Sequence, residues 1–506
     1  MAKHLSYFLA FALIASIFSS CTQPPEETYD GTNIALSDSG ITVDGHAATG
    51  DSWQAVYVAN DIVYYEEGRD FTYGDGAEKD AHSSEEAAAH TVVHITKPGQ
   101  YILSGKLSKG QIAIDLGEDA KGDTNAVVTL VLMGVDITCT VAPGIIFYNV
   151  YECGNKDEAS ATVDTTKAGA NIIVADGTEN TVNGAYVAKI YKPGSAELNA
   201  DGTEVVDAKK LHKYDGAVYS KMSMNISGGS KGSGTLNINA TNEGLDSELH
   251  LTINGGNIRI ASGNDGINAN EDGVSVTTVN GGNLTIVVNG ATGEGDGIDS
   301  NGWLVINGGS VFAQGCSFSG DAGIDSDMGI HINGGTVIAT GNMLDRISES
   351  RQNYAVFQFA GSTSGTFTLK NDTGTALLEQ TIANNFTYLV VSCPALTAGN
   401  YTLWQGDTQL QGVSSGNMGG HGPGGMMPPG GMEPPEGMES PEGTEPPEGM
   451  KPPEGQHPPA GKHPPQGGEP GQRPGSGFFP GAGGEISKIF AIQDGGNYFV
   501  DLQKSA

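Results

Sequence analysis

Apolar and polar residues alternate in short runs along the middle of the chain. Segments such as "HLTINGG", "NLTIVVNG" and "TVIATG" carry apolar residues at alternate positions and close on Gly or Asn-Gly. A period of two is typical of β-strands, and the closing residues favour tight turns because they adopt positive φ angles at low cost. No stretch of helical periodicity interrupts these runs. We therefore predict an all-β protein.

A turn of the form apolar-Asn-Gly-Gly recurs about every 26 residues, with Ser in place of Asn in the first copy. The apolar residues of the five copies are Ile226, Ile253, Val279, Ile306 and Ile332. A second apolar column runs in register with the first and comprises Val218, Leu245, Ile267, Ile298 and Ile324. Such a repeat predicts a solenoid whose coils stack about 4.8 Å apart, with the aliphatic columns inside and the Asn amides hydrogen-bonded along a ladder.

The repeat also sets the predicted boundaries. Weaker copies extend upstream, so we expect the solenoid over 91–341 and an N-terminal cap over 51–90. Residues 342–412 alternate without the repeat and suit a β-rich C-terminal cap, since an open last coil would expose strand edges. Residues 413–484 repeat Pro, Glu and Gly and predict a disordered arm. Strand character returns over 485–506, a segment that could pair with the cap.

The N-terminus is typical of an exported protein. Residues 1–20 read as a signal peptide, because Lys3 and His4 precede an apolar run too short to span a bilayer. Cys21 follows in "FSSC", which resembles a bacterial lipobox, so we expect lipidation at Cys21 and a tether over 21–50. The alternative is ordinary cleavage that leaves Cys21 as a thiol. The following Glu-Glu pair resembles the signal of some Bacteroidetes lipoproteins, which predicts an outer-membrane protein of the cell envelope that faces the exterior.

The net negative charge of the chain argues against some classes of binding partner. The 25 Lys and Arg residues are outnumbered by 59 Asp and Glu, for a net charge of -34, which would repel nucleic acid and anionic lipid. We expect a monomer that meets the membrane only through its lipid anchor. The remaining cysteines, at 139, 153, 316 and 393, match no zinc pattern. They predict buried thiols, with a disulfide between Cys139 and Cys153 as the alternative.

Acidic residues flank the second apolar column on two sides. One acidic column comprises Asp246, Asn268, Asp299 and Asp325, and the other Glu243, Asp265, Asp296 and the offset Asp321. Like charges about 4.8 Å apart repel unless neutralised, and Ca²⁺ takes oxygen ligands at about 2.3–2.6 Å, so an ion fits between two rungs. The alternative is that each Asp only caps its own turn.

The segments "YILSGKLSKGQIAIDL", "LVLMGVDIT" and "VADGTENTV" precede the "DGI" and "INGG" coils in the sequence. Their order and register give a resemblance, over about residues 85–412, to a bacterial family of carbohydrate-binding, pectate-lyase-like proteins. It implies a right-handed parallel β-helix, calcium held by acids at the coil turns, and binding to cellulose and pectic polygalacturonate. This chain departs from the pattern at Tyr219, where the acidic column begins.

Polysaccharide binding without cleavage is therefore the predicted function, with Tyr219, Arg259 and Trp303 as candidate sugar contacts, although aromatic residues also serve packing. A polyuronate lyase would need a base and cations, and residues 217–340 hold only Lys221, Lys231 and Arg259. A lyase or glycoside hydrolase is one alternative. An adhesin or scaffold that binds a protein is the other.

Overall fold

The computed structural model describes residues 27–154, 160–415 and 485–505. Strands dominate these residues, and helix is limited to the short α1 (Ser84–Ala88) and the 3₁₀ turns η1 (Glu78–Asp80) and η2 (Glu118–Gly122). The all-β prediction is confirmed. The signal peptide, Cys21 and the arm from residue 416 to 484 lie outside the described residues.

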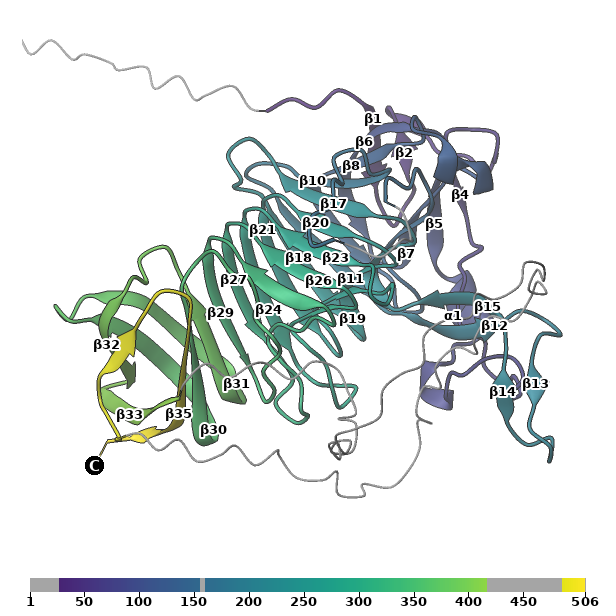
Figure 1. Ribbon diagram of the computed structural model, residues 1–506. Coiled ribbons are helices and arrows are strands. Elements are labelled where there is room, and N and C mark those ends of the chain that lie inside the picture. The colour runs from purple at the N-terminus through teal and green to yellow at the C-terminus, as the bar shows by residue number, and fades with distance from the viewer. Residues whose placement is uncertain (1–26, 155–159, 416–484, 506) are drawn as a thin grey trace, which may run out of the picture.

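Most strands before residue 342 form three stacks, in which each strand pairs in parallel with its counterpart in the next repeat of the sequence; we call each such repeat a coil (Figure 1). The first stack comprises β10 (Ala170–Val174), β17 (Met224–Gly228), β20 (Leu251–Ile253), β23 (Val276–Val279), β26 (Trp303–Ile306) and β28 (Gly329–Ile332). The second comprises β11 (Glu179–Gly184), β18 (Thr235–Ala240), β21 (Asn257–Ser262), β24 (Asn283–Val288), β27 (Ser310–Gln314) and β29 (Thr336–Gly341).

The third stack is a separate sheet. It comprises β5 (Thr91–Ile95), β7 (Gly110–Asp115), β9 (Ile145–Asn149), β16 (Gly216–Ser220), β19 (Glu243–Ser247), β22 (Ile267–Ala269) and β25 (Ile298–Ser300), with β4 (Val56–Ala59) antiparallel at its edge. Near the N-terminus, the long strands β6 (Gly99–Leu107) and β8 (Val128–Thr138) contribute to both the first and the second stack.

The predicted columns agree with the observed register. Ile226, Ile253, Val279, Ile306 and Ile332 pair in succession in the first stack, and Val218, Leu245, Ile267, Ile298 and Ile324 do so in the third. All ten are buried in one core. Because alternate residues of a strand face opposite sides, the residues beside them point away from that core.

The turns also behave as their sequence predicts. The Asn amides donate along a ladder, from Asn280 to Asn254 at 2.9 Å, from Asn307 to Asn280 at 2.9 Å and from Asn333 to Asn307 at 3.0 Å. The four Asn turns also each end on a glycine of positive φ, namely Gly256, Gly282, Gly309 and Gly335. At Gly282 (φ 83°) a Cβ would lie 2.6 Å from a backbone oxygen of the preceding coil, so a larger residue is excluded by both conformation and space.

The N-terminal tether is shorter than predicted. β1 (Thr32–Leu36) pairs in parallel with β6, and β2 (Thr42–Val43) and β3 (His46–Ala47) form a hairpin beside it. Ile34 and Leu36 are buried in the same core as the coils. Residues 32–47, predicted as part of a tether, therefore form strands that pair and pack with the coils.

The cap forms its own core. β30 (Tyr354–Asn371), β31 (Ala376–Ser392), β32 (Gly399–Gln405) and β33 (Thr408–Ser415) are joined by β34 (Phe490–Ile492) and β35 (Gly496–Lys504), so the C-terminal segment does pair with the cap (Figure 1). β31 runs antiparallel to β29 and covers the last strand of the second stack. Phe357, Phe386, Phe490 and Phe499 are buried in the cap.

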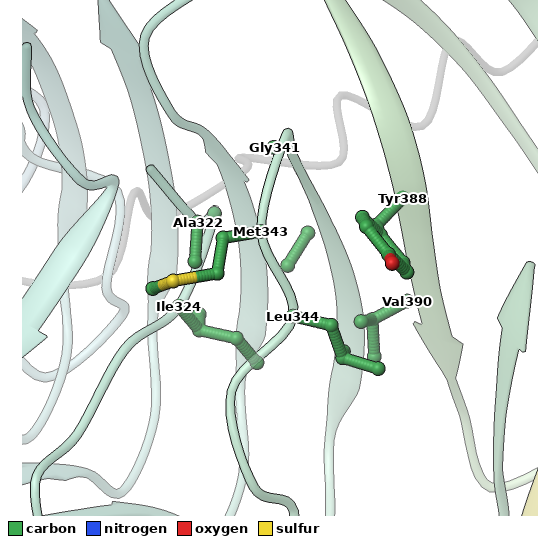
Figure 2. A pocket seen from close by; sticks show the side chains of 9 residues that line it. Ala322, Ile324, Gly341, Met343, Leu344, Tyr388 and Val390 are labelled. Carbon is green, nitrogen blue, oxygen red and sulfur yellow. The ribbon is translucent and has the colours of Figure 1, made fainter. Parts of the chain in front are cut away.

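The junction of coils and cap is closely packed. Figure 2 shows Ile324, Met343 and Leu344 on the coil side and Tyr388 and Val390 on the cap side of a small apolar cavity. Its volume of about 10 Å³ is close to the minimum for one water molecule. This cavity is too small to be a ligand site.

One insertion interrupts the coils. Between β11 and β16, β12 (Val187–Tyr191) and β15 (Lys210–Tyr214) form a hairpin that is extended by β13 (Glu197–Leu198) and β14 (Val205–Asp207) (Figure 1). Val187, Ile190 and Tyr214 pack with Ile146 and Tyr219 of the third stack. The hairpin therefore rests on the outer side of that stack, which the repeat did not predict.

The cysteines at 139, 153, 316 and 393 are free thiols, so the structure contradicts the alternative of a Cys139–Cys153 disulfide. Burial raises the pKa of the Cys139 thiol to about 12 and that of Cys153 to about 11, which keeps both protonated at neutral pH. Among the described residues, no helix combines the length and hydropathy that crossing a membrane requires.

Candidate metal centre

The predicted acidic column lies on the outer side of the third stack. Asp246 pairs with Asn268 and Asn268 with Asp299, while a bridge between Ile298 and Ile324 places Asp325 on the next rung. Tyr219 occupies the rung before Asp246. The register that the sequence predicted is confirmed. Burial, hydrogen-bond partners and neighbouring charges then decide whether these residues can hold a metal ion.

Three carboxylates meet at the N-terminal end of the column, and we call Asp215, Glu243 and Asp246 the first acidic cluster. Their ligand oxygens lie within 4.8 Å of one another. Asp215 precedes β16, and Glu243 and Asp246 lie on β19. These residues are 8%, 5% and 0% exposed, so water cannot screen their mutual repulsion.

Several oxygens of this cluster have no hydrogen-bond partner among the described residues. They are Glu243 Oε2, Asp246 Oδ2 and the neighbouring Asn268 Oδ1. The companion oxygens are bonded, since Asn268 Nδ2 donates to Glu243 Oε1 at 3.2 Å and Asn270 Nδ2 to Asp246 Oδ1 at 2.5 Å. Each unpaired buried polar atom costs about 1–3 kcal/mol, and more where it is charged. Oxygens of this kind are the ligands that Ca²⁺ prefers, so the donor set fits a hard divalent cation.

The electrostatics of the cluster are one-sided. Burial raises the pKa of Glu243 and of Asp246 well above the usual carboxyl value, and the neighbouring carboxylates raise both further. Burial also raises the pKa of Asp215, against the opposing effect of Lys213, whose Nζ lies 2.6 Å from Asp215 Oδ2. The Lys213 ammonium thus faces three carboxylates, with a smaller contribution from Lys210 at Asp215, so the cluster could accept a further positive charge.

The second acidic cluster comprises Asp265, Asp296, Asp299 and Asp325. Two of these carboxylates accept backbone N–H groups from the following coil, since Asp296 N donates to Asp265 Oδ1 at 2.6 Å and Ala322 N donates to Asp296 Oδ1. Asp321 similarly accepts from Gly295 N at 2.7 Å. These acids therefore link neighbouring coils rather than cap only their own turns.

The pKa values of the carboxyl groups in the second cluster are also raised. Burial, followed by the repulsion of nearby carboxylates, raises the pKa of Asp265, of Asp299 and of Asp325 to about 7. Burial and the Asp265 carboxylate raise the pKa of Asp296 well above its usual value. In the metal-free protein near neutral pH, the carboxyl groups of this cluster are therefore partly protonated and partly ionised. A cation that binds there would compete with the bound protons.

Asp215 and Lys213 were not among the predicted site residues. Asp215 stands three positions before Val218 of the apolar column, which is the spacing of the offset Asp321 before Ile324, so the sequence held a signal for it. Lys213 had no such signal, because it belongs to the hairpin outside the repeat.

The three predicted sugar contacts lie on different stacks, so the structure does not bring them together. Arg259 is exposed on β21 of the second stack, and Trp303 begins β26 of the first, its ring 4.9 Å from that of His331. Tyr219 is 2% exposed in the third stack and donates from its hydroxyl to Glu248 Oε1 at 2.7 Å. A ring so deeply buried cannot stack on a sugar, so Tyr219 is corrected to a packing residue.

Comparison with known proteins adds the family. The family model described as "Carbohydrate-binding domain-containing protein" matches residues 89–366. A protein of the same description from Acetivibrio thermocellus is 29% identical over 169 residues, which cover 33% of this chain and 44% of the relative, so the chain spans less than half of that curated relative. The structure of a polysaccharide lyase-like protein from C. thermocellum, a gadolinium derivative, aligns at 20% identity and a TM-score of 0.33, covering 63% of this chain and 91% of that chain. Because the family match extends over more than half of the 506 residues, the chain belongs to the carbohydrate-binding domain-containing proteins.

Proposed function

We propose that this protein binds polysaccharide without cleaving it and that calcium ions between its coils stabilise the binding surface. Membership of the carbohydrate-binding family is the observation that carries the proposal. Cellulose and acidic pectic glycans are the polysaccharides we propose, following the resemblance described above.

The calcium part rests on the first acidic cluster. Asp215, Glu243 and Asp246 would supply carboxylate ligands and Asn268 an amide oxygen. Two of the carboxylates and the amide have a buried oxygen that meets no partner in the described part of the chain. An ion held there would bridge β19 and β22 and offset the repulsion between rungs. Its role is structural, since the bound charge would hold successive coils together.

The fold part of the proposal is that the three stacks form a right-handed parallel β-helix of about 26 residues per coil. The parallel pairing in all three stacks and the repeated Asn turn support it. Such a solenoid presents long flat faces on which an extended glycan could lie.

The location we propose is the cell envelope, with the chain anchored through Cys21 to the outer membrane and facing the exterior. A lipid anchor would leave the described body free to meet insoluble polysaccharide. Replacing Cys21 by Ala should then release the protein from the membrane fraction, whereas unchanged partition would argue against the anchor.

Affinity gels that contain cellulose derivatives or polygalacturonate test the binding directly, run with calcium and with chelator. Retarded migration relative to an inert protein supports the proposal. Absence of retardation by any glycan, combined with capture of a defined protein partner, would favour an adhesin. Ultraviolet-absorbing unsaturated uronates or new reducing ends above those of a heat-killed control would show cleavage and contradict a purely binding role.

A further inference from the structure

Basic residues are concentrated on the hairpin insertion of this acidic chain. The hairpin region carries Lys189, Lys192, Lys209, Lys210 and Lys213, although Lys and Arg together number 25 against 59 acidic residues. Lys189 and Lys213 face Asp75 and Asp215, respectively. Lys210 pairs instead with Glu248 after β19, and both Lys210 and Lys121 lie near enough to Lys221 to repel its charge.

The register of the third stack brings this second group together. Phe147 pairs with Ser220 and Ser220 with Ser247, so the residues that follow them, Tyr148, Lys221 and Glu248, succeed one another on adjacent rungs about 4.8 Å apart. Lys210 Nζ lies 3.2 Å from Glu248 Oε1.

The third lysine comes from a turn beside the same edge. Lys121 belongs to η2, and its carbonyl accepts from Glu152 N at 3.1 Å, shortly after β9. Lys121 of η2 thus joins Lys210 of β15 and Lys221, which directly follows β16, at this edge of the third stack.

Aromatic side chains border these lysines. The hydroxyl of Tyr214 lies 2.7 Å from His212 Nδ1, and the Tyr214 ring meets that of Tyr148 edge-on with centroids 5.5 Å apart. Tyr214 is buried, whereas His212 and Tyr148 are of intermediate exposure. Partly exposed rings beside cations are the surroundings in which a charged sugar can both stack and form ion pairs.

The positive charges at this edge are only partly compensated. Lys210 pairs with Glu248, while Lys121 and Lys221 form no ion pair with another described residue. Burial lowers the pKa of Lys221, Lys121 and Lys210 lower it further, and the opposing acids are Glu248 and Asp115. Burial, followed by Lys221, also lowers the pKa of His212, so the imidazole is neutral at pH 7. An anion at this edge would relieve the repulsion among the lysines.

We propose that Lys121, Lys210 and Lys221, bordered by Tyr148 and His212, form a subsite for the carboxylate of an acidic sugar and make the protein prefer anionic to neutral polysaccharide. The inference rests on the proposed glycan-binding function and names the residues that give it selectivity. A carboxylate accepts hydrogen bonds from several ammonium groups at once, and the sugar's apolar face packs on the aromatic rings. Neutral glycans gain nothing from the lysines.

The test compares two double variants of the full chain. Lys121→Gln with Lys221→Gln removes two of the three lysine charges of the subsite, and Lys231→Gln with Lys488→Gln removes two exposed charges elsewhere as the matched control. Dissociation constants for de-esterified polygalacturonate, fully methyl-esterified pectin and a neutral soluble glucan are measured by calorimetry at several salt concentrations, with calcium and with chelator. Thermal melts establish that all variants are folded.

We expect the subsite variant to bind polygalacturonate about tenfold more weakly and with a flatter salt dependence, while its binding to the two neutral ligands is unchanged. The control variant should match the wild type with all three ligands. The subsite would be overturned if polygalacturonate affinity fell equally in both variants, or if the subsite variant lost affinity for the neutral ligands to the same extent. It would also be overturned if polygalacturonate binding depended on calcium but not on the lysines. Wild-type binding to neutral glycans alone overturns the subsite but leaves the proposed function intact, whereas no binding to any glycan removes both.

Discussion

The two acidic clusters of the third stack derive from the same repeat yet differ in what surrounds them. In the first, Asp215, Glu243 and Asp246 are buried near Lys213 of the hairpin, and two carboxylate oxygens have no hydrogen-bond partner within residues 27–154, 160–415 and 485–505. In the second, Asp265 and Asp296 are tied to the next coil by backbone N–H groups. The comparison teaches that a repeated residue acquires its chemistry from the non-repeated segments beside it.

The largest expected effect is that of calcium on stability. If an ion binds only the native state, calcium at 100 times its dissociation constant should stabilise the protein by about 2.7 kcal/mol, and chelator should remove that gain. Glu243→Gln with Asp246→Asn should abolish most of the calcium response, measured as the shift in melting temperature. Asp299→Asn with Asp325→Asn should abolish less of it, because the second cluster is already partly satisfied by protons and N–H groups. The reverse ranking would place the ion in the second cluster, and a melt indifferent to calcium and chelator would reduce both clusters to turn and coil contacts.

Next in size is the pH dependence of the metal-free protein. Asp265, Asp299 and Asp325 have a folded pKa of about 7, above the value of about 4 for an unfolded Asp. Their contribution to stability is therefore full below about pH 4 and is lost as pH rises through 7, with a total change on the order of a few kcal/mol.

Urea unfolding at pH 4.5, 6 and 8 in chelator measures this slope. Asp299→Asn with Asp325→Asn should flatten it. Calcium should reduce the loss of stability as pH rises, because the ion replaces the protons on these carboxylates. Stability that increases steadily with pH in chelator would contradict the raised pKa values.

A smaller change in stability is expected when Lys213, the lysine beside the first acidic cluster, is replaced. Lys213→Met removes the ammonium 2.6 Å from Asp215 and should cost about 1–3 kcal/mol of unfolding free energy in chelator. The same variant should bind calcium more tightly, because a competing cation has been removed. Lys210→Met, at the more exposed Glu248 pair, is the control and should change stability by less than about 1 kcal/mol. Equal effects of the two substitutions would show that Lys213 has no special relation to the cluster.

The smallest change is expected at Tyr219. Tyr219→Phe keeps the buried ring but loses the hydroxyl bond to Glu248, which should cost about 1 kcal/mol and leave glycan affinity unchanged. Denaturant unfolding and an affinity gel measure the two quantities on one sample. A selective loss of glycan binding at unchanged stability would restore Tyr219 as a sugar contact.

The repeat made much of the fold predictable from the sequence. The columns through Val218 and Ile226, the Asn ladder and the register of Asp246, Asn268 and Asp299 all follow from identical spacing, because stacking turns a sequence period into a spatial neighbour. The pairing of the C-terminal segment with the cap was also anticipated from its strand character.

Long-range contacts outside the repeat were not predictable. β1 offers only two buried aliphatic residues, too short a pattern to separate from a tether. Lys213 reaches the first cluster because the hairpin folds back on the third stack, and no periodicity encodes that approach. Asp215 could have been predicted, because it precedes Val218 of the apolar column by the same number of residues as Asp321 precedes Ile324. It lies outside the aligned acidic column, however.

The Asn ladder has a consequence for how such a chain can change over generations. The side-chain amides of Asn254, Asn280, Asn307 and Asn333 bond to their nearest neighbours in the stack. A gene duplication that inserts one coil's worth of codons at a turn would therefore preserve every existing rung and simply lengthen the array by about 4.8 Å. Each added unit would also bring its own Asp, so length and the number of acidic rungs would grow together.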